Sequence, residues 1–476
     1  MSFYRTGIFL SLLLQASLLN AQQTLLQYDL DENKQWQANA KLSFSSDKVL
    51  ATLVYATGIE RFVLKNDSII KQSSQETINT NDNSKQQGYV LKKDLENIQL
   101  PYMSGFLNGD TLVECNYAKA KKELYFTETI LSGAVTTTAD TLFISKEENL
   151  LVVTAMQNTL YIICSVEETD KLNIYVKRNG EKIKSFEKTI PFSSPAEKDK
   201  KKSKVFADYF STKGNRKYFV FEKHTSYLSN ISSIKNKIYP QDGKIVFSIE
   251  NSIYETYLIT LNLSNFAHTV RKYPSLPDIT IVNEDPADFV NSYVRDSFLC
   301  KAGVFQDVFF LQLFNLSTND IIYNTYIKAS DKKAIAEALF FTSGSFKKQG
   351  SNSPERIMKL LKNEYFYLLF DKADSNKCNI SLQFYAKATL DYTFGIAPIS
   401  LTTDSDAIQN SIDYKTGQVT GVSSNNKPLN IRLAELKYFI EQNTVEASEP
   451  GIYIYDGSIY ASCVDKGGGK FYVYKF

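Results

Sequence analysis

Histidine and tryptophan are almost missing from this 476-residue chain, which has 2 His and 1 Trp. Two histidines are too few for a multi-histidine metal centre and leave little room for histidine-based catalysis. An excess of one charge is also missing, since 54 Lys and Arg stand against 52 Asp and Glu, a formal net charge of +2. Nucleic-acid-binding proteins normally carry a basic excess or a basic domain. The composition therefore argues against a nucleic-acid partner.

Long apolar runs are missing beyond the N-terminus. The most apolar later stretches are Leu150 to Met156 and Val308 to Phe314. Both are far shorter than the roughly 18 residues that a membrane helix needs. We therefore expect no transmembrane helix after the N-terminal segment.

Cysteine is scarce and widely spaced. The five positions are Cys115, Cys164, Cys300, Cys378 and Cys463. Without a CxxC or any close pair, the spacing excludes a zinc ribbon and a thioredoxin-like site. An odd count leaves at least one thiol unpaired in an exported chain. Cys164, within TLYIICSV, has the surroundings of a small buried hydrophobe, and we predict mostly free core cysteines.

Catalytic and cofactor motifs are missing too. GxSxG and HExxH do not occur, nor do a P-loop or GxGxxG. His224 and His268 both lie at strand-like positions without a nucleophile motif nearby, which favours a structural or surface role. No cofactor is expected, and the sequence identifies no catalytic residue.

The N-terminal segment has the pattern of a secretory signal peptide. Arg5 gives a positive start, Ile8 to Leu19 form an apolar run, and Ala21 supplies a small residue at the cleavage edge. The run Leu-Asn-Ala-Gln-Gln over residues 19–23 resembles export signals of Bacteroidetes-type bacteria. We expect residues 1–21 to be removed and the protein to be secreted, periplasmic or on the cell surface.

Aromatic residues are abundant, at 13 % with 30 Tyr and 31 Phe, and they favour strands. Short β-rich runs separated by turns fill residues 140–190, where Asn179-Gly180 is a strong hairpin signal because both turn residues must accept positive φ. Similar blocks, including VFADYFS from Val205, recur at 205–239, 244–273, 297–328, 364–392 and 452–476.

These blocks resemble four-stranded blades and predict an all-β fold. We expect a β-propeller-like array of antiparallel four-stranded meanders over residues 22–476 as one domain, with six to eight blades at about 60 residues each. N-terminal strands near Lys41 to Tyr55 would pair with C-terminal strands near Tyr453 to Phe476. Minor helical insertions are expected at Ser330 to Phe341 and Pro354 to Leu361.

Polar stretches punctuate the strands. Residues 72–88, 197–204 and 402–428 are rich in polar or charged side chains and are predicted to be loops.

Two acidic patterns are candidates for a metal site or a catalytic site. Asp29, Asp31 and Asn33 have D-x-D-x-N spacing, but Lys34 and Ala40 stand where an EF-hand needs Gly and Glu. The alternating Asn79, Asn81 and Asn83 have the same spacing, which is more typical of a turn. Glu284, Asp285 and Asp288 form the densest acidic cluster and could serve glycoside hydrolysis, although Asp-Pro is ordinary turn chemistry. The metal-binding residues therefore stay unknown.

One other architecture has an argument. Phe471-Tyr472-Val473-Tyr474-Lys475-Phe476 resembles the closing strand of outer-membrane β-barrels. Many strands, however, are apolar on both faces, whereas a water-filled barrel alternates strictly. Two-sided apolar strands fit stacked propeller sheets.

Two classes of function stay open. An exported propeller without a nucleophile, metal motif or phosphate loop is most simply a non-enzymatic binding or scaffolding protein, with an unknown protein or glycan ligand. The alternative is a carbohydrate-active hydrolase whose carboxylates come from different blades.

Overall fold

The computed structural model describes most of the strands and several turns. The described residues are 23–30, 36–44, 49–55, 58–65, 68–74, 102–118, 121–130, 135–192, 204–211, 218–221, 236–241, 243–250, 255–275, 289–305, 308–328, 330–331, 341–343, 364–372, 377–386, 407–413, 416, 418–421, 436, 439–440, 451–455, 458–465 and 469–475. The expected signal peptide and the helical insertion from Pro354 lie outside them, as do residues 332–340 of the other expected insertion.

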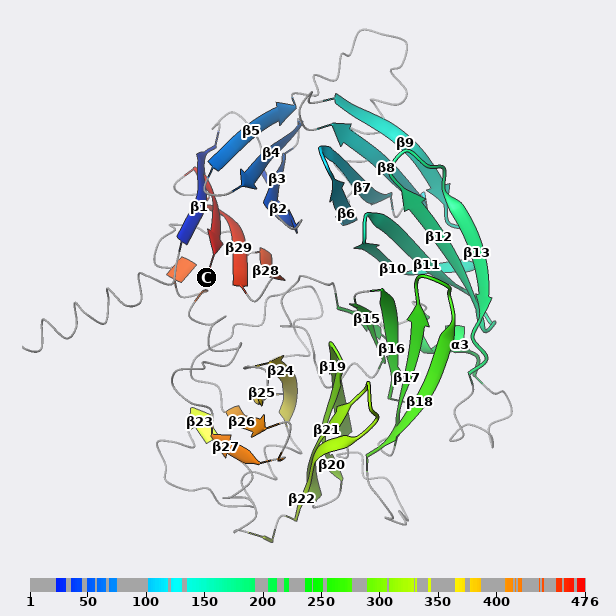
Figure 1. The fold of residues 1–476 in the computed structure, drawn as a ribbon, viewed down its shortest axis with the longest axis vertical. Helices are drawn as coiled ribbons and strands as arrows, with labels where there is room; N and C mark the ends of the chain where they lie inside the picture. The colour runs from blue at the N-terminus through cyan, green and yellow to red at the C-terminus, as the bar shows by residue number, and fades with distance from the viewer. Residues whose placement is uncertain are drawn as a thin grey trace, which may run out of the picture.

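The described strands form seven sheets that follow one another around a ring (Figure 1). The chain is an all-β propeller, as its aromatic and β-branched runs predict. We number the sheets as blades 1 to 7 in chain order.

Five blades are four-stranded antiparallel meanders. Blade 1 contains β2 (Trp36–Phe44), β3 (Val49–Tyr55), β4 (Gly58–Lys65) and β5 (Ser68–Ser74). Blade 2 contains β6 (Tyr102–Asn108), β7 (Thr111–Ala118), β8 (Glu123–Ile130) and β9 (Val135–Phe143). Blade 3 contains β10 (Glu148–Met156), β11 (Thr159–Val166), β12 (Lys171–Arg178) and β13 (Lys184–Thr189). Blade 5 contains β19 (Phe289–Arg295), β20 (Phe298–Phe305), β21 (Val308–Asn315) and β22 (Ile321–Lys328). Blade 7 contains β28 (Gly451–Tyr455), β29 (Ser458–Asp465), β30 (Lys470–Lys475) and β1 (Gln23–Asp29).

The two remaining blades each have an additional strand. Blade 4 contains β14 (Tyr218–Val220), which runs parallel to β15 (Asn236–Gln241), and then β16 (Lys244–Ile249), β17 (Glu255–Asn262) and β18 (His268–Pro274). Blade 6 contains β23 (Phe341–Ser343), β24 (Glu364–Lys372), β25 (Lys377–Ala386), β26 (Ala407–Asp413) and β27 (Val419–Gly421). Figure 1 shows β6, β10 and β15 nearer the middle of the ring and β9, β13 and β18 at its periphery.

The ring is joined by a different N-terminal strand from the one expected. β1, with Gln23 opposite Lys475 and Asp29 opposite Lys470, pairs with β30. The expected segment Lys41 to Tyr55 instead forms β2 and β3 of blade 1. Its apolar side chains pack against the C-terminal blade without pairing to it, since Leu42 and Leu53 share a core cluster with Phe471. β1 pairs with the opposite end of the chain, and a contact between such distant segments leaves no local signal in the sequence.

The tightest hairpin of blade 3 is also not the one expected. Gln157 and Asn158, with φ of 48° and 57°, join β10 to β11 in a two-residue turn. At Asn179-Gly180 only Gly180 has positive φ among the described turn residues, and five residues separate β12 from β13. Asn-Gly therefore marks a hairpin here, but a longer one.

Two other local expectations were wrong. Residues 402–428 were expected to be a loop, yet β26 and β27 lie there, because β26 pairs with β25 and buries Ile412. VFADYFS was expected to be a strand, yet α3 (Phe206–Tyr209) is helical. The carboxylates of Asp170 and Asp208 accept hydrogen bonds from the backbone N–H groups of Phe206 and Val205, which stabilises the start of a helix.

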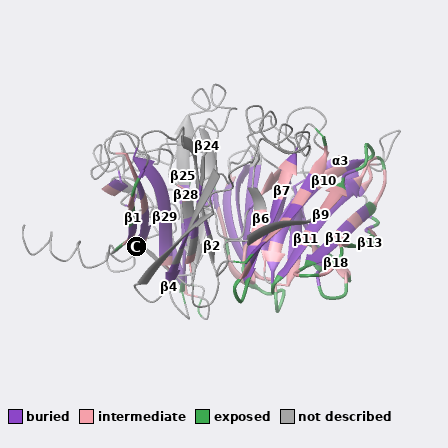
Figure 2. Cartoon of the chain, turned by 90° about the horizontal axis from the view of Figure 1, so that it is seen from above, coloured by how far each residue is buried: buried purple, intermediate pink, exposed green. Residues whose placement is uncertain are grey.

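The core lies between neighbouring blades. One apolar cluster joins blades 3 and 4 around Phe206 and Phe247, and another joins blades 4, 5 and 6 around Tyr293 and Leu311. All five cysteines are buried and carry free thiols. Figure 2 shows buried residues along the strands and exposed residues mainly at the turns between them. Among the described residues, no helix combines the length and the apolar composition that a membrane crossing requires.

Candidate functional site

Most acidic candidates from the sequence fall outside the described residues. Asp31, Asn33 and the Asn79 triplet lie there, as does the Glu284 cluster. Asp29 is described and lies in β1 opposite Lys470. His224 is likewise outside, whereas His268 is the half-buried first residue of β18. Across the described part of the chain, no three His, Cys, Asp or Glu side chains gather in a way that could hold a metal ion.

Two carboxylates meet a buried lysine between blades 2 and 3. Lys177 on β12 is 2 % exposed, and its Nζ lies 3.1 Å from Glu128 Oε1 on β8 and 3.6 Å from Asp140 Oδ2 on β9. Nζ also donates to the carbonyl oxygen of Glu181 at 2.7 Å, and Gly180 N donates to Glu128. This network fixes the β12–β13 turn against blade 2. It also brings two partly exposed carboxylates to one lysine, and glycoside hydrolysis needs two carboxyl groups at a defined separation.

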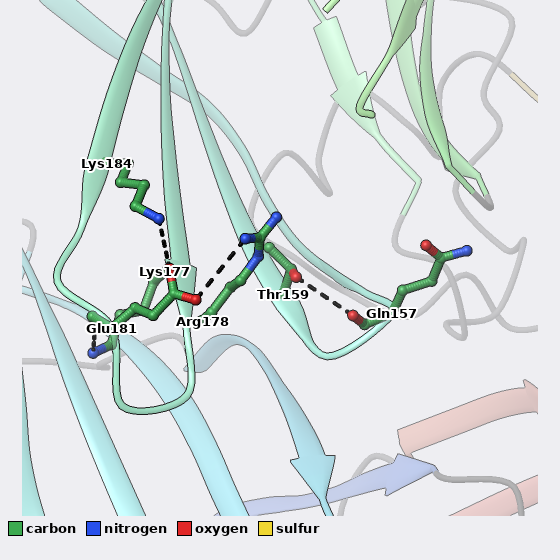
Figure 3. Close-up of polar contacts among 6 residues, drawn as sticks. All are labelled: Gln157, Thr159, Lys177, Arg178, Glu181 and Lys184. Carbon is green, nitrogen blue, oxygen red and sulfur yellow. Dashed lines mark hydrogen bonds and ion pairs between the residues drawn. The ribbon is translucent and has the colours of Figure 1, made fainter. Parts of the chain in front are cut away.

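The side chain of Glu181 organises the same turn from the outside (Figure 3). Its carboxylate lies 2.7 Å from Lys184 Nζ and 3.9 Å from Arg178 Nη1. The hydrogen bond from Lys184 and the nearby positive charges lower the pKa of Glu181. Because these groups are exposed, the contacts shape the turn more than they stabilise the fold.

A buried acid lies in blade 3. Glu148 accepts hydrogen bonds from Ser145 N at 2.8 Å, Asn173 Nδ2 at 2.7 Å and Tyr175 OH at 2.6 Å. Burial raises the pKa of Glu148, but these hydrogen bonds outweigh burial and lower it. Three donors hold the ionised carboxylate in place, so Glu148 links β10 to β12 structurally.

Blades 4 and 5 bury a polar layer between them. Lys237 Nζ lies 3.1 Å from Glu250 Oε1, and the two side chains are 0 % and 2 % exposed. Ser248 and Ser292, one from each blade, place their Oγ atoms 3.2 Å apart. Burial lowers the pKa of Lys237, and Glu250 opposes that shift. A charge this deep is tolerated because an opposite charge compensates it.

Lys301 extends this layer toward the rim. It comes from β20 of blade 5 and donates to the Tyr273 carbonyl at 2.8 Å and to Ser275 Oγ at 2.9 Å, at the end of β18 of blade 4. Burial lowers the pKa of Lys301 to about 7, against the opposing effects of Glu250 and Glu255. Lys301 is fully buried, so its amine connects two blades and is not presented to solvent.

The outer ends of blades 3 and 4 present a different surface. Phe186 on β13 and Val270 on β18 are 41 % and 43 % exposed, although both are large apolar residues. The rings of Phe186 and Phe266 have centroids 4.9 Å apart, so the two blades touch here. Lys188 and His268 are both half-buried. Burial and, to a smaller extent, the positive charge of Lys188 lower the pKa of His268. We call Phe186, Lys188, Phe266, His268 and Val270 the rim patch.

The strand registers explain why the side chains of the rim patch lie between blades 3 and 4. Phe186 and Lys188 are opposite Ile174 and Leu172 of β12. Register partners project from the same face of a sheet, and both partners belong to the core between blades 3 and 4. On blade 4, His268 and Val270 are opposite Leu261 and Ile259, which belong to that same core. The rim patch is therefore the solvent end of the apolar layer between blades 3 and 4.

Sequence reasoning missed both the polar layer and the rim patch. Lys301 stands inside the apolar run FLCKAGVF and Glu250 ends KIVFSIE, and such charges within two-sided apolar strands are a signal of burial. No comparable signal marks Phe186, because KSFEKT has the charge pattern of any edge strand.

Comparisons with known proteins find only distant structural likenesses. No family model and no curated protein matches the sequence. The chain is similar to the crystal structure of the WD40 domain of SCAP from fission yeast, with 9 % identity over 95 % of this chain and 97 % of that one and a TM-score of 0.31. An uncharacterized protein from Listeria monocytogenes gives 8 % over 94 % and 97 %, with a TM-score of 0.37. An oligogalacturonate lyase in complex with manganese gives 10 % over 94 % and 96 %, with a TM-score of 0.33. Likeness at this level says nothing about substrate or partner.

Proposed function

We propose that this chain is an exported, non-enzymatic binding or scaffolding protein of the cell envelope or extracellular space. One observation carries the proposal: large apolar side chains are exposed together at the rim, whereas Lys237, Glu250, Lys301 and Glu148 are buried and bonded within the fold. Contiguous exposed apolar side chains are typical of interaction surfaces. Buried charges that are bonded within the protein are typical of structural ties between strands.

Export is supported by the leader and by where the first strand begins. β1 starts at Gln23, two residues after the predicted cleavage at Ala21. Cleavage there would leave Gln22 at the N-terminus and keep the strand that pairs with β30. Intact-mass measurement on protein recovered from the exporting host tests this, and a mass that retains residues 1–21 would contradict it.

The hydrolase alternative has one specific observation in its favour, the carboxylate pair Glu128 and Asp140. Their shared partner Lys177 binds both carboxylates and offsets one of their two negative charges, which is why we assign the pair to structure. Purified protein should show no turnover on a panel of chromogenic glycosides. Turnover that disappears in Glu128→Gln or Asp140→Asn would replace the binding proposal with the enzymatic one.

A further inference from the structure

The outer strand of blade 3 has an edge to which another strand can pair. β13 is the last strand of its sheet and pairs with β12, and among the described residues no other strand pairs with it. Five of its six residues are exposed. Edge strands present unpaired backbone N–H and C=O groups, and an extended peptide can bind by completing the ladder.

Charge on the two faces of β13 differs. Glu187, on the face away from blade 4, pairs with Lys171 at 3.0 Å. On the rim-patch face, Lys188 is half-buried and makes no ion pair or hydrogen bond within the described residues. After burial, its positive charge contributes to the lowered pKa of His268 on the neighbouring blade's β18. His268 Nδ1 is buried without a hydrogen-bond partner in the described structure. A carboxylate brought to this position would compensate Lys188 and relieve its repulsion of a protonated His268.

The spacing of the patch defines what fits it. Phe186 and Lys188 are two residues apart, so they lie on one face of the strand. A strand added beside β13 alternates in the same way. The added strand can therefore place an apolar side chain on Phe186 and Val270 and an acidic side chain at Lys188 only if these two side chains are two residues apart.

We propose that the rim patch binds an extended acidic peptide segment of a partner protein, added as a strand to the edge of β13. An apolar residue of the segment packs on Phe186, Phe266 and Val270, and an Asp or Glu two residues away pairs with Lys188. This inference rests on the proposed binding function and names its partner class.

The test uses the full chain and two labelled peptides of about ten residues, a usual strand length. The matched peptide places Phe and Glu two residues apart within threonines. The shifted peptide has the same composition with Phe and Glu adjacent, so that they point to opposite faces. Fluorescence anisotropy should show binding of the matched peptide that weakens with salt, and weaker binding of the shifted one.

Variants locate the site. Lys188→Glu should weaken matched-peptide binding by about tenfold or more, because attraction becomes repulsion in a half-buried place. Lys146→Glu makes the same charge change at an exposed position in the turn before β10, and Phe143→Ser removes a 67 % exposed ring from blade 2. Both should bind like the parent, whereas Phe186→Ser should not. Equal binding of the two peptides, or unchanged binding by Lys188→Glu, would overturn the proposal.

The remaining outcomes distinguish a failure of this inference from a failure of the proposed binding function. Polygalacturonate that binds in a Lys188-dependent way, while the matched peptide does not, would overturn the peptide in favour of an anionic glycan. A failing peptide together with glycoside turnover would overturn the binding function itself. A failing peptide in a chain that still captures an envelope protein, equally well with Phe186→Ser, would overturn the rim patch and leave the function standing.

Discussion

Blade 4 packs against blades 3 and 5, and the two interfaces differ in where their charged side chains lie. Toward blade 5 it buries Lys237 and Glu250 and receives Lys301 from its neighbour. Toward blade 3 its interface is apolar, with Phe247, Ile259 and Leu261 in the shared core. The charged groups of that side, such as Lys188, stand at the solvent end.

The difference shows how one fold uses some charged residues to stabilise its blades and leaves others available to bind a partner. A charge paired in the interior fixes the relative position of two sheets, but it is inaccessible to a partner. An incompletely paired charge beside exposed apolar side chains has little value for stability and is available for recognition. We therefore expect substitutions at the two interfaces to affect different properties.

The largest effect is expected from breaking the buried ion pair. Lys237→Met leaves Glu250 buried without its partner and should lower the free energy of unfolding by about 3–5 kcal/mol. The matched control lies in the same blade: Lys272 pairs with Glu255 at 2.8 Å but is 53 % exposed. Lys272→Met should cost less than about 1 kcal/mol. Chemical denaturation measures both, and equal losses would show that the buried pair has no special role.

The next effect is a pH dependence from Lys301. Its pKa in the folded chain is about 7, below the usual lysine value, so between pH 7 and 9 the unfolded chain binds a proton that the folded chain does not. Stability should therefore rise with pH over this window, with a slope from this group of up to about 1.4 kcal/mol per unit. Burial also lowers the pKa of Lys237, so its contribution to the pH dependence has the same sign. Lys301→Met should flatten the slope of unfolding free energy against pH, and an unchanged slope would contradict a lowered lysine pKa.

A smaller gain is expected from a change that touches neither interface. Gln157 and Asn158 both have positive φ, a conformation that Asn-Gly adopts with little strain. Replacing the pair by Asn-Gly should stabilise the chain by up to about 1 kcal/mol, because glycine adopts positive φ without the steric cost of a Cβ atom. Thermal unfolding measures it, and a loss of stability would mean that the turn is not the tight hairpin described.

The smallest effect on stability is expected at the rim patch. Phe186→Ser and Lys188→Glu should each change the free energy of unfolding by about 0.5 kcal/mol or less, as substitutions at the protein surface usually do. A loss as large as that of Lys237→Met would make the rim patch a structural element and remove the comparison between the two interfaces.

Sequence reasoning reached the fold because it depends on a repeated local pattern. Runs such as TLYIICSV and VFFLQLF are apolar on both faces, and that predicts stacked sheets. The pairing of Gln23 with Lys475 and the strand at Ile412 depend on contacts between distant segments, which no local pattern encodes. The rim patch forms only because the registers of β13 and β18 place their side chains toward each other. Neither KSFEKT nor HTVRKYP alone therefore predicts the patch.

The central claim is that Lys188 and His268 face a binding surface for an acidic segment. Because the chain has 2 histidines, the imidazole signal of His268 can be followed by proton NMR through a pH titration. Adding the matched peptide should raise the pKa of His268, since a carboxylate at Lys188 offsets the lysine charge that now lowers it. In Lys188→Glu the pKa should already be higher without peptide and should not respond to it. A His268 pKa that stays the same when the matched peptide saturates the wild-type chain would contradict the account.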